Sequence, residues 1–469
     1  MSNKPVKHAQ AAAEFLEDDP HRLFHDERLW DMRQKRDQQM HGMPEWQELR
    51  DRASRIKEHT LANLPTYLEQ FEENARRNGI HVHWARDGAE HNRIVAEIMG
   101  KHDAKSLIKS KSMITDECEM REYLEPRGIT VTETDLGERI QQLDHQLPSH
   151  VVVPAVQKLT GDVAKIFAKY YGTDPNIKDP HELAEAQREA ARPVLLSGDT
   201  GMTGGNFIVA ETGGFVVCTN EGNADLSSNL PNVHIATLGI ERLVPRVEDL
   251  GVFVRLLSRS ALGSPITQYT THFRGPRKGG EMHVILVDNG RSDRLAMPQF
   301  WSSLKCIRCG ACMNTCPVYR RSGGQSYGSV YSGPIGAIID PTFNAKKFST
   351  LPFASTMNGS CSNVCPVEIN IHEQIYDWRR VLAEKHDIPF VKREIMKMAG
   401  RLLAQPRLYR VSIEGTEVAL KTMPRFVLYN YLNPWGKHRE LPHPVKETFN
   451  SWYRKNRLKT STKKEHESA

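Results

Sequence analysis

The sequence predicts an α/β domain in the middle of the chain, followed by a cysteine-rich, all-helical domain, with helical regions at both ends. From about residue 79, short apolar runs alternate with amphipathic stretches, as is typical of layered α/β architectures. Six of the eight cysteines lie between Cys306 and Cys365. The length of 469 residues exceeds that of one ordinary domain, so several structural units are expected.

The chain is expected to divide into four segments. Residues 1–75 are polar, with helical spacing of their apolar positions, and predict an N-terminal helical extension. Residues 76–296 carry the α/β pattern, and residues 297–382 carry the grouped cysteines. Residues 383–469 contain helical stretches interrupted by prolines, which predicts a small helical C-terminal module.

Apolar periodicity places individual elements within the α/β segment. Two β-rich runs surround Thr212, Gly213 and Gly214, which is the pattern of a hairpin with glycine at its turn. The expected elements are, in order, a strand at 80–84, a helix near 86–100, a strand at 106–108, a helix opened by residues 115–117, the hairpin within 206–220, a strand at 233–236, a helix near 246–260 and a strand at 282–287.

Composition and charge argue against several classes of protein. With 39% hydrophobic and 26% charged residues, the chain is of the globular, soluble type. The net charge of +6 is small for this length and no clustered basic recognition motif accompanies it, so we expect no nucleic-acid partner. Basic residues exceed acidic ones in the tail at 453–469, which we expect to be a solvated end that an anionic partner or a membrane surface could attract.

We find neither an apolar signal core nor a membrane-spanning run. Charged residues interrupt residues 1–20, and no stretch reaches the roughly 18 apolar residues that a spanning helix needs. Cysteines grouped at metal-ligand spacing favour a reducing compartment over a disulfide framework. We therefore expect a cytoplasmic protein, with the basic tail permitting a peripheral position at the membrane.

The strongest functional signal is the run Cys306, Cys309, Cys312 and Cys316, with Pro317 directly after it. This spacing is typical of ferredoxins that hold 4Fe-4S clusters, because soft thiolates bind iron well and two-residue gaps let three of them reach one cluster. The fourth cysteine of such a run characteristically ligates the other cluster. The pattern predicts an electron-transfer protein.

A second copy of this run is incomplete. Cys361 and Cys365 are in register with the last two cysteines of the first copy. Ser355 and Asn358 stand where the first two cysteines would be, and neither a hydroxyl nor an amide replaces a thiolate well. The second copy can therefore supply two thiolates instead of four.

Because the fourth cysteine of each copy would ligate the cluster of the other copy, the two clusters have unequal ligand sets. The first cluster has four thiolates, whereas the second has two. Three outcomes are open for the second: no cluster, a labile or smaller cluster completed by oxygen or by a partner subunit, or two free thiols. The ligand count favours absence. The predicted ligands are Cys306, Cys309, Cys312 and Cys365 for the first cluster, and Cys316 and Cys361 for the second.

Zinc is the alternative occupant of such a region. A structural zinc site prefers two separated pairs of cysteines in a closed tetrahedron, and a triple run in which every gap is two residues fits it badly. The two cysteines outside the region have a simpler interpretation. Cys118 lies near a predicted helix start and Cys218 in an apolar strand, so both are expected to be small buried side chains.

The α/β domain offers weaker signals for ligand binding. The glycine-rich segment at 198–205 precedes a strand and could present backbone N–H groups to a carboxylate or phosphate, although it is not a dinucleotide fingerprint. Polar residues at the hairpin ends could converge on a ligand, but turn chemistry explains part of the loop at 219–223. The candidate binding residues are Glu211, Asn220, Glu221 and Arg277, with Lys109, Lys111, Tyr269 and Arg274 as further polar or positive groups.

As a set, these segments resemble the lactate utilisation protein B family. No single short run is specific, but together they cover the chain from about residue 20 to residue 460. The matching runs are 109–113, 133–137, 209–213, 219–223, 267–269 and 275–277, together with the whole cysteine region. Ser355 and Asn358 depart from the family's pattern, which bears on the second cluster and leaves the first intact.

The resemblance implies an iron-sulfur subunit that relays electrons during oxidation of L-lactate to pyruvate, within a larger L-lactate dehydrogenase complex. It implies a lactate-utilisation (LUD) domain similar to the CoA-transferase and ribose-phosphate isomerase folds, a ferredoxin-type domain and a family-specific C-terminal region. Two companion subunits are implied: an iron-sulfur protein with cysteine-rich repeats and a second lactate-utilisation-domain protein.

A different class of function is the alternative to electron relay. The sequence contains no flavin or nicotinamide motif, so we do not assign hydride chemistry to this chain. In the alternative, the chain is a metabolite-binding or isomerase-like module with a structural cluster. Glu211 would then act on a bound acid or sugar phosphate.

Overall fold

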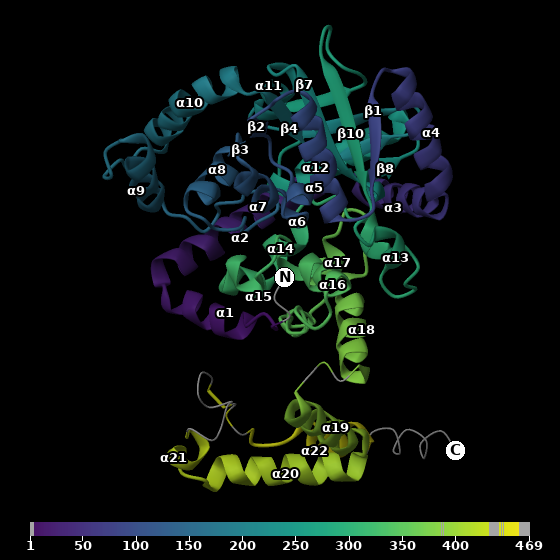
Figure 1. Cartoon of the computed structure of the whole chain (residues 1–469). Coiled ribbons are helices and arrows are strands. Elements are labelled where there is room, and N and C mark those ends of the chain that lie inside the picture. Colours follow the sequence, from purple (N-terminus) through teal and green to yellow (C-terminus); the bar gives the residue numbers. More distant parts are fainter. Residues whose placement is uncertain are drawn as a thin grey trace. The chain divides into compact units, whose positions relative to one another are not determined.

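The computed structural model in Figure 1 describes residues 4–385, 387, 389–430, 440–441, 443 and 445–458. These residues form two compact units, Met1–Asp387 and Ile388–Ala469. Among them, no helix combines the length and the apolar character that crossing a membrane requires. The part of the expected basic tail beyond residue 458 lies outside the described residues.

A six-stranded parallel sheet is the centre of the first unit. Its strand order is β1-β10-β7-β4-β2-β3, and every neighbouring pair is parallel. This confirms the predicted α/β class. In that order the strands are His81–Ala85, Glu281–Val287, Val233–Gly239, Thr200–Thr203, Ser106–Lys109 and Thr130–Glu133.

Side chains on strand β10, which lies between β1 and β7, alternate between two apolar cores. Val284 and Leu286 belong to one core, which α4 (Leu64–Arg77) covers, whereas Ile285 belongs to the other, which α5 (Gly88–Lys101) covers. Neighbouring residues of a strand point to opposite faces, so both faces of this sheet are buried. Burial on both faces explains why β7 and β10 are nearly continuous apolar runs.

A second, smaller sheet contains the predicted hairpin. Its order is β8-β5-β6-β9, with bounds Leu243–Val244, Phe207–Val209, Gly214–Thr219 and Tyr269–Phe273. Strands β5 and β6 are antiparallel, as expected from the glycines between them. Gly213 has a φ of +63°, and a Cβ there would lie 2.2 Å from the backbone nitrogen of Ala75 in α4. Glycine is therefore required both by the turn and by the close approach of α4.

Several elements differ from the sequence-based expectation. The predicted helix near Thr115 is instead two short helices, α6 (Met113–Glu117) and α7 (Met120–Leu124), because the chain turns at Glu119 with a φ of +53°. The glycine-rich segment at 198–205 does not simply precede a strand, since it contains β4 itself. Strand β3 was not expected either.

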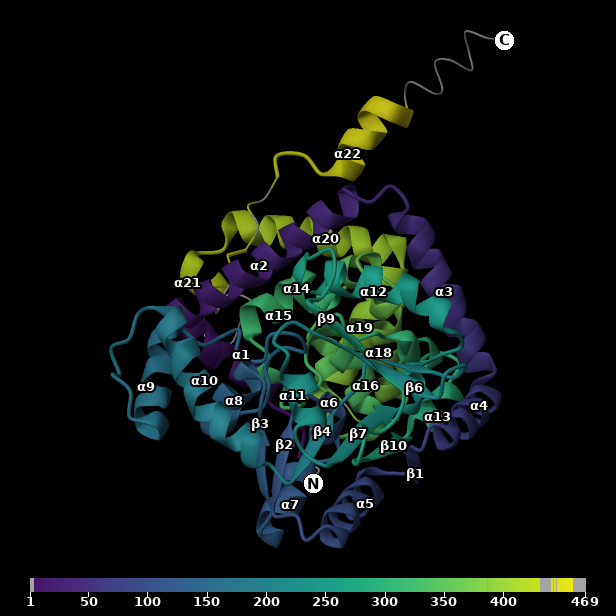
Figure 2. The same ribbon diagram turned by 90° about the horizontal axis from the view of Figure 1, so that it is seen from above.

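Helices α8 (Leu136–Leu143), α9 (Thr160–Tyr171) and α10 (Pro180–Ser197) form an apolar cluster of their own. Helix α8 packs against β3, and Figure 2 shows α9 and α10 at the outer edge of the domain on that side. The remaining elements of this domain include α11 (Asn223–Asn229), α12 (Val247–Leu262) and α13 (Arg291–Leu295).

The cysteine region contains only helices among its described elements. They are η3 (Trp301–Lys305), α14 (Ala311–Thr315), α15 (Pro317–Ser322), η4 (Gln325–Tyr327), α16 (Gly333–Phe343), η5 (Leu351–Phe353), α17 (Ser360–Asn363) and α18 (Ile371–Glu384). The first helices of the chain cover it (Figure 1): α1 (His8–Glu17) packs on α15 and η4, and α2 (Asp19–His41) packs on α14, α15 and α12. Helix α3 (Trp46–Ala62) contacts α12 and η3, so it bridges the α/β domain and the cysteine region.

The regular elements of the second unit are all helices over its described residues. It contains α19 (Phe390–Ala404), α20 (Pro406–Thr422), α21 (Arg425–Leu428) and α22 (Phe449–Tyr453), and α19 packs against α20. Neither long helix has a buried residue, and large apolar side chains such as Val391, Met398, Leu403 and Val411 are more than half exposed.

Gly201→Ala tests how tightly β4 packs against α11. A Cβ at Gly201 would lie 1.7 Å from the carbonyl oxygen of Ser227, so the substitution should destabilise the α/β domain by roughly 3 kcal/mol. Gly161→Ala is the control, because no atom lies within 4 Å of the added Cβ in α9 and alanine favours a helix. Thermal unfolding followed by circular dichroism should show a lower melting temperature for Gly201→Ala only. Equal melting temperatures would contradict this packing.

Candidate iron-sulfur centre and the cavity beside it

Four cysteine side chains line one small cavity in the helical region. Cys306, Cys309 and Cys312 come from the first motif and Cys365 comes from the second. Cys306 is half-buried and the other three are buried. The remaining wall is mostly apolar and includes Val151, Ile307, Ile335, Val367, Ile369 and Ile371. The cavity therefore brings together the four thiols predicted for the first cluster, from Cys306 to Cys365 in the sequence.

The loop geometry suits thiolates that bind a cluster. Arg308 and Gly310 have φ values of +59° and +75°, which turn the chain around the cavity. The backbone N–H of Arg308 donates to Cys306 Sγ at 3.4 Å, and the N–H of Ile369 donates to Cys365 Sγ at 3.4 Å. Such donors stabilise negative charge on sulfur. Four converging soft donors with N–H groups directed at them fit a 4Fe-4S cluster.

Protons compete with metal for these thiols. Burial raises the pKa of Cys365 to about 11 and raises the pKa of Cys312 well above its usual value. Without metal, the thiols of Cys312 and Cys365 are therefore neutral at neutral pH. Metal binding must therefore release protons from the site.

The N-terminal helices hold the turn that carries Cys365. Arg50 in α3 donates to the Cys365 carbonyl oxygen from Nε at 3.0 Å and from Nη2 at 2.9 Å. Arg36 in α2 donates from Nη2 to the Val364 carbonyl oxygen at 3.2 Å. These bonds tie the second motif to helices α2 and α3, so the N-terminal segment positions a candidate ligand.

The incomplete second motif keeps the backbone of the complete one. Met357 and Gly359 have φ values of +58° and +78°, which repeat those of the first loop. The Met357 N–H donates to Ser355 Oγ at 3.2 Å, and the Ser360 N–H donates to Asn358 Oδ1 at 3.1 Å. The two replacement side chains accept the kind of bond that sulfur accepts in the first loop. The loop conformation therefore persists without its thiolates.

Cys316 and Cys361 are buried and lie near each other. Burial raises the pKa of Cys361 to about 11, with a smaller contribution from Cys316. Tyr319 donates its backbone N–H to Cys316 Sγ at 3.5 Å. No disulfide joins any of the described cysteines.

A buried network of charges lies beside the four-cysteine cavity. Arg291 forms a bidentate pair with Glu117, at 2.8 and 2.9 Å, and its Nε donates to Glu241 at 2.5 Å. All three side chains are 4% exposed or less. Burial alone would raise the pKa of Glu241, but the surrounding guanidinium groups outweigh it and hold that pKa well below its usual range. Glu241 is therefore charged.

Arg308 links this network to the cysteine loop. Its Nη2 lies 3.7 Å from Glu241 Oε1, and its guanidinium lies 4.5 Å from the Tyr331 ring centre. Nε and Nη1 of Arg308 are buried and have no hydrogen-bond partner among the described residues.

Lys57 is a further buried cation of this network. It donates to the carbonyl oxygens of Glu241 and Leu243, and burial lowers its pKa to about 7.

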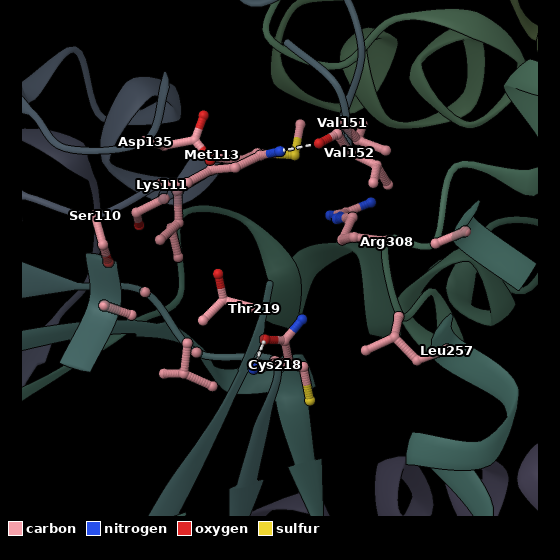
Figure 3. A pocket seen from close by; sticks show the side chains of 18 of the residues that line it. Ser110, Lys111, Met113, Asp135, Val151, Val152, Cys218, Thr219, Leu257 and Arg308 are labelled. Carbon is pink, nitrogen blue, oxygen red and sulfur yellow. Dashed lines mark hydrogen bonds between the residues drawn. The ribbon is translucent and has the colours of Figure 1, made fainter. Parts of the chain in front are cut away.

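A second cavity, of about 250 Å³, lies in the α/β domain next to the first one. Loops at the carboxyl ends of β2, β4 and β7 form its walls, and Val151 and Arg308 line both cavities. Figure 3 shows Arg308 projecting toward this cavity from one side, with Lys111 and Thr219 on others. Lys111 donates to the Val152 carbonyl oxygen, which closes one wall.

The candidate binding residues from the α/β domain separate into two groups. Asn220, Glu221 and Lys111 line the 250 Å³ cavity, as do Gly204 and Gly205 from the glycine-rich segment. The others do not line it.

The residues of the second group lie elsewhere. Tyr269 is the first residue of β9 and Arg274 directly follows that strand. Glu211 accepts from the Val247 N–H at the start of α12. Arg277 donates to Asn232 and to the Pro231 carbonyl oxygen, and Lys109 is buried in an ion pair with Glu133.

Arg308, Arg242, Glu241 and Val151 are site residues that the sequence reasoning missed. Arg308 lies in the two-residue gap between Cys306 and Cys309, to which the cysteine pattern assigns no role. Its positive charge, placed between two predicted cluster ligands, was the one feature of the sequence that could have indicated a role for it. The other three come from segments that the fold alone brings to the site, so no local pattern indicated them.

Comparison with known families agrees with this architecture. The LUD domain model matches residues 68–294, and the 4Fe-4S dicluster domain model matches residues 302–369. The chain is therefore a LUD-domain protein with a 4Fe-4S domain joined to it.

Similar proteins extend over nearly the whole chain. It is 41% identical over 450 residues to "Lactate utilization protein B" of Macrococcus caseolyticus, covering 92% of this chain and 93% of that protein. It is 42% identical over 424 residues to "Lactate utilization protein B" of Shouchella clausii (87% and 88%). It is 40% identical over 428 residues to "Uncharacterized electron transport protein YkgF" of Escherichia coli K12 (87% and 88%). The chain belongs to the lactate utilization protein B family.

Arg291→Met tests the buried charge network. It leaves Glu117 and Glu241 buried without their main partner, so the free energy of unfolding should fall by about 3 to 5 kcal/mol. Arg188→Met, which removes an exposed pair with Glu185, should change it by less than about 0.5 kcal/mol. Urea unfolding followed by fluorescence measures both. A small effect of Arg291→Met would show that the network does not stabilise the fold.

Proposed function

We propose that this chain is the iron-sulfur electron-transfer subunit of a multi-subunit complex that oxidises L-lactate to pyruvate. The observation that carries the proposal is the convergence of four thiols on one cavity, within a domain matched by the 4Fe-4S dicluster model. The names of the relatives, which include both lactate utilisation and electron transport, supply the pathway.

In this proposal Cys306, Cys309, Cys312 and Cys365 hold a single 4Fe-4S cluster, which supplies one-electron redox chemistry when it is bound. The chain's own residues position the sulfurs, shield them from water and direct N–H groups at them. Nearby guanidinium groups lie close to Cys306 and favour negative charge there. The two-electron chemistry of lactate belongs to the assembly and not to this chain alone.

We further propose that the second motif holds no complete cluster with ligands from this chain. Cys316 and Cys361 provide two thiolates, and Asn358 is exposed and bonded to its own loop. The two thiols then remain free.

The proposed organisation has four parts: a helical extension at 1–75, the LUD domain at 76–296, the ferredoxin-type domain at 297–382 and a helical module at 383–469. The LUD domain would have a fold like those of CoA-transferases and ribose-phosphate isomerase, and the ferredoxin-type domain would be all-helical. The two sheets within 81–287 and the helices within 301–384 support the order of these parts, while the boundaries at 75 and 382 fall inside α4 and α18.

The proposed partners are an iron-sulfur protein with cysteine-rich repeats and a second LUD-domain protein, in the cytoplasm or peripherally at the membrane. The exposed apolar side chains of α19 and α20 support a subunit contact, because apolar surface of this kind is typical of interfaces.

Cys365→Ser tests the assigned ligand set and the function together. The variant should lose most of its iron, because three thiolates and a hydroxyl hold a cubane poorly. In a complex reconstituted with the companion subunits, lactate-dependent reduction of a dye should fall to background. Cys118→Ala is the control: Cys118 is buried outside the cysteine region and both readouts should stay near wild type. A Cys365→Ser protein that retained iron and activity would contradict the proposal.

The double variant Ser355→Cys, Asn358→Cys tests the account of the second motif. Because its loop keeps the backbone of the first, restoring two thiolates should allow a second cluster. Iron should rise from about four to about eight atoms per chain after anaerobic purification. Ser355→Ala, Asn358→Ala is the matched control and should stay at about four. If wild-type protein already contained about eight, the proposed absence of a second cluster would be wrong.

A further inference from the structure

The 250 Å³ cavity lies where a parallel sheet characteristically binds ligands. The chain passes from β2 outward to β3, but from β4 it proceeds the other way, to β7 and β10. The loops after β2 and β4 diverge at this switch point, and residues of both loops line the cavity. Ligands of open α/β sheets bind at the carboxyl ends of the strands at such a point. The fold therefore supplies a binding site apart from the cysteine cavity.

Two arginine side chains at the cavity have guanidinium N–H groups that the described residues do not fully satisfy. The side chain of Arg308 is only 7% exposed and projects toward the cavity (Figure 3). Two of its nitrogens lack hydrogen-bond partners among the described residues. Arg242 also lines the cavity, and within the same part of the chain its buried Nη1 has no partner either. Buried donors of this kind are costly unless a ligand or water satisfies them. An anion is the group that two guanidinium donors accommodate best.

The carboxylates at the cavity do not remove this charge. Glu241 pairs closely with Arg291, while Arg308 and Arg242 lie 3.7 and 3.8 Å from it. Glu221 accepts from Thr219. The remaining lining carboxylate, Asp135, accepts the Glu138 N–H at the start of α8.

Hydroxyl and amide groups complete the lining. Ser110, Ser112, Thr219, Asn220 and Thr267 all line the cavity, and no group in the described part of the chain hydrogen-bonds the buried hydroxyl of Ser112. These groups suit a hydroxyl or carbonyl oxygen on the same ligand. A volume of about 250 Å³ lies below the range of drug-sized sites, roughly 300 to 1,000 Å³. The ligand is therefore a small organic anion with one further oxygen function.

Arg308 connects this cavity to the proposed cluster. It lies between Cys306 and Cys309, its backbone N–H donates to Cys306 Sγ, and its side chain lines the second cavity. Reduction adds negative charge to a cluster, and a nearby guanidinium favours that charge. An anion bound to Arg308 offsets part of the guanidinium field. It should therefore disfavour the reduced state.

We propose that the cavity binds a small hydroxy- or oxo-carboxylate and that the bound carboxylate, acting on Arg308, lowers the reduction potential of the adjacent cluster. This proposal rests on the proposed function, since it takes Cys306 and Cys309 as cluster ligands. No bond forms or breaks in it. Its consequence is that occupancy of the α/β domain makes the reduced centre a stronger electron donor.

Pyruvate and L-lactate are the probes, and lactamide is the neutral control with nearly the same shape. Isothermal titration calorimetry on the anaerobic full chain should show binding of at least one of the two carboxylates and none of lactamide. Equal binding of lactamide, or equal binding of inorganic phosphate, would overturn the assignment of a carboxylate site. An EPR-monitored redox titration with saturating carboxylate should give a more negative midpoint, and an unmoved midpoint would overturn the coupling.

Arg308→Gln should weaken binding by about 10-fold or more and abolish the shift in midpoint. Arg321→Gln is the matched control: Arg321 is half exposed, pairs with Asp26 and does not line the cavity. Binding to Arg321→Gln should match that to wild type. Undiminished affinity in Arg308→Gln would overturn the role of Arg308.

Ser112→Ala keeps the test decisive if Arg308→Gln loses iron or fails to fold. It removes a hydroxyl that has no hydrogen-bond partner among the described residues and does not line the four-cysteine cavity, so affinity should fall while iron content stays at the wild-type value. Unchanged affinity would overturn the cavity as the binding site. A chain without a reducible cluster would refute the proposed function, and calorimetry would still measure binding separately. A reducible cluster with no carboxylate binding would refute this inference alone.

Discussion

The meeting of Cys365 with the Cys306, Cys309 and Cys312 loop is the constraint on which the rest of this structure depends. Four thiols separated in sequence must converge on one small cavity, and the chain achieves this through helices that pack around them. Arg36 and Arg50, from helices far earlier in the chain, hold the main chain at Val364 and Cys365. The N-terminal segment is thus part of the scaffold of the centre, because its donors fix a turn that apolar packing alone would leave unspecified.

Charge is the second organising feature. The guanidinium groups of Arg242, Arg291 and Arg308 are buried around Glu241, where each would be costly without a partner. A cluster with four thiolate ligands is anionic, and Arg242 and Arg308 lie within electrostatic reach of Cys306. The excess of positive charge is therefore understandable as compensation for a negative centre. The same groups line the cavity of the α/β domain, so the two sites share one electrostatic environment.

The sequence predicted the parts of this molecule that rest on local patterns. Apolar runs located β1, β2, β7 and β10, and glycines located the β5–β6 hairpin, because side-chain period and turn chemistry are local properties. Strand β4 was missed because its sequence, Thr-Gly-Met-Thr, is neither apolar nor alternating, and its burial comes from neighbours. Cysteine spacing identified the centre, but not Arg308, Arg242 or Val151. Their roles arise from tertiary packing. Tertiary packing also sets the place of Glu211, whose carboxylate accepts the first N–H of α12, and its role toward a ligand stays a prediction.

The second loop keeps the backbone conformation of a cluster loop although it lacks two of the thiolates. Its backbone conformation therefore does not depend on those ligands. Met357 and Gly359 preserve the left-handed turns of a cluster loop, so what the second motif lacks is sulfur. The central claim is one cluster on four thiolates from two motifs. Integrated EPR of dithionite-reduced, anaerobically purified protein, compared with its iron and sulfide content, tests it most directly. We predict about one unpaired spin, with about four iron and four sulfide, per chain. Two interacting spins with about eight iron, or protein that binds zinc in place of iron, would contradict the account.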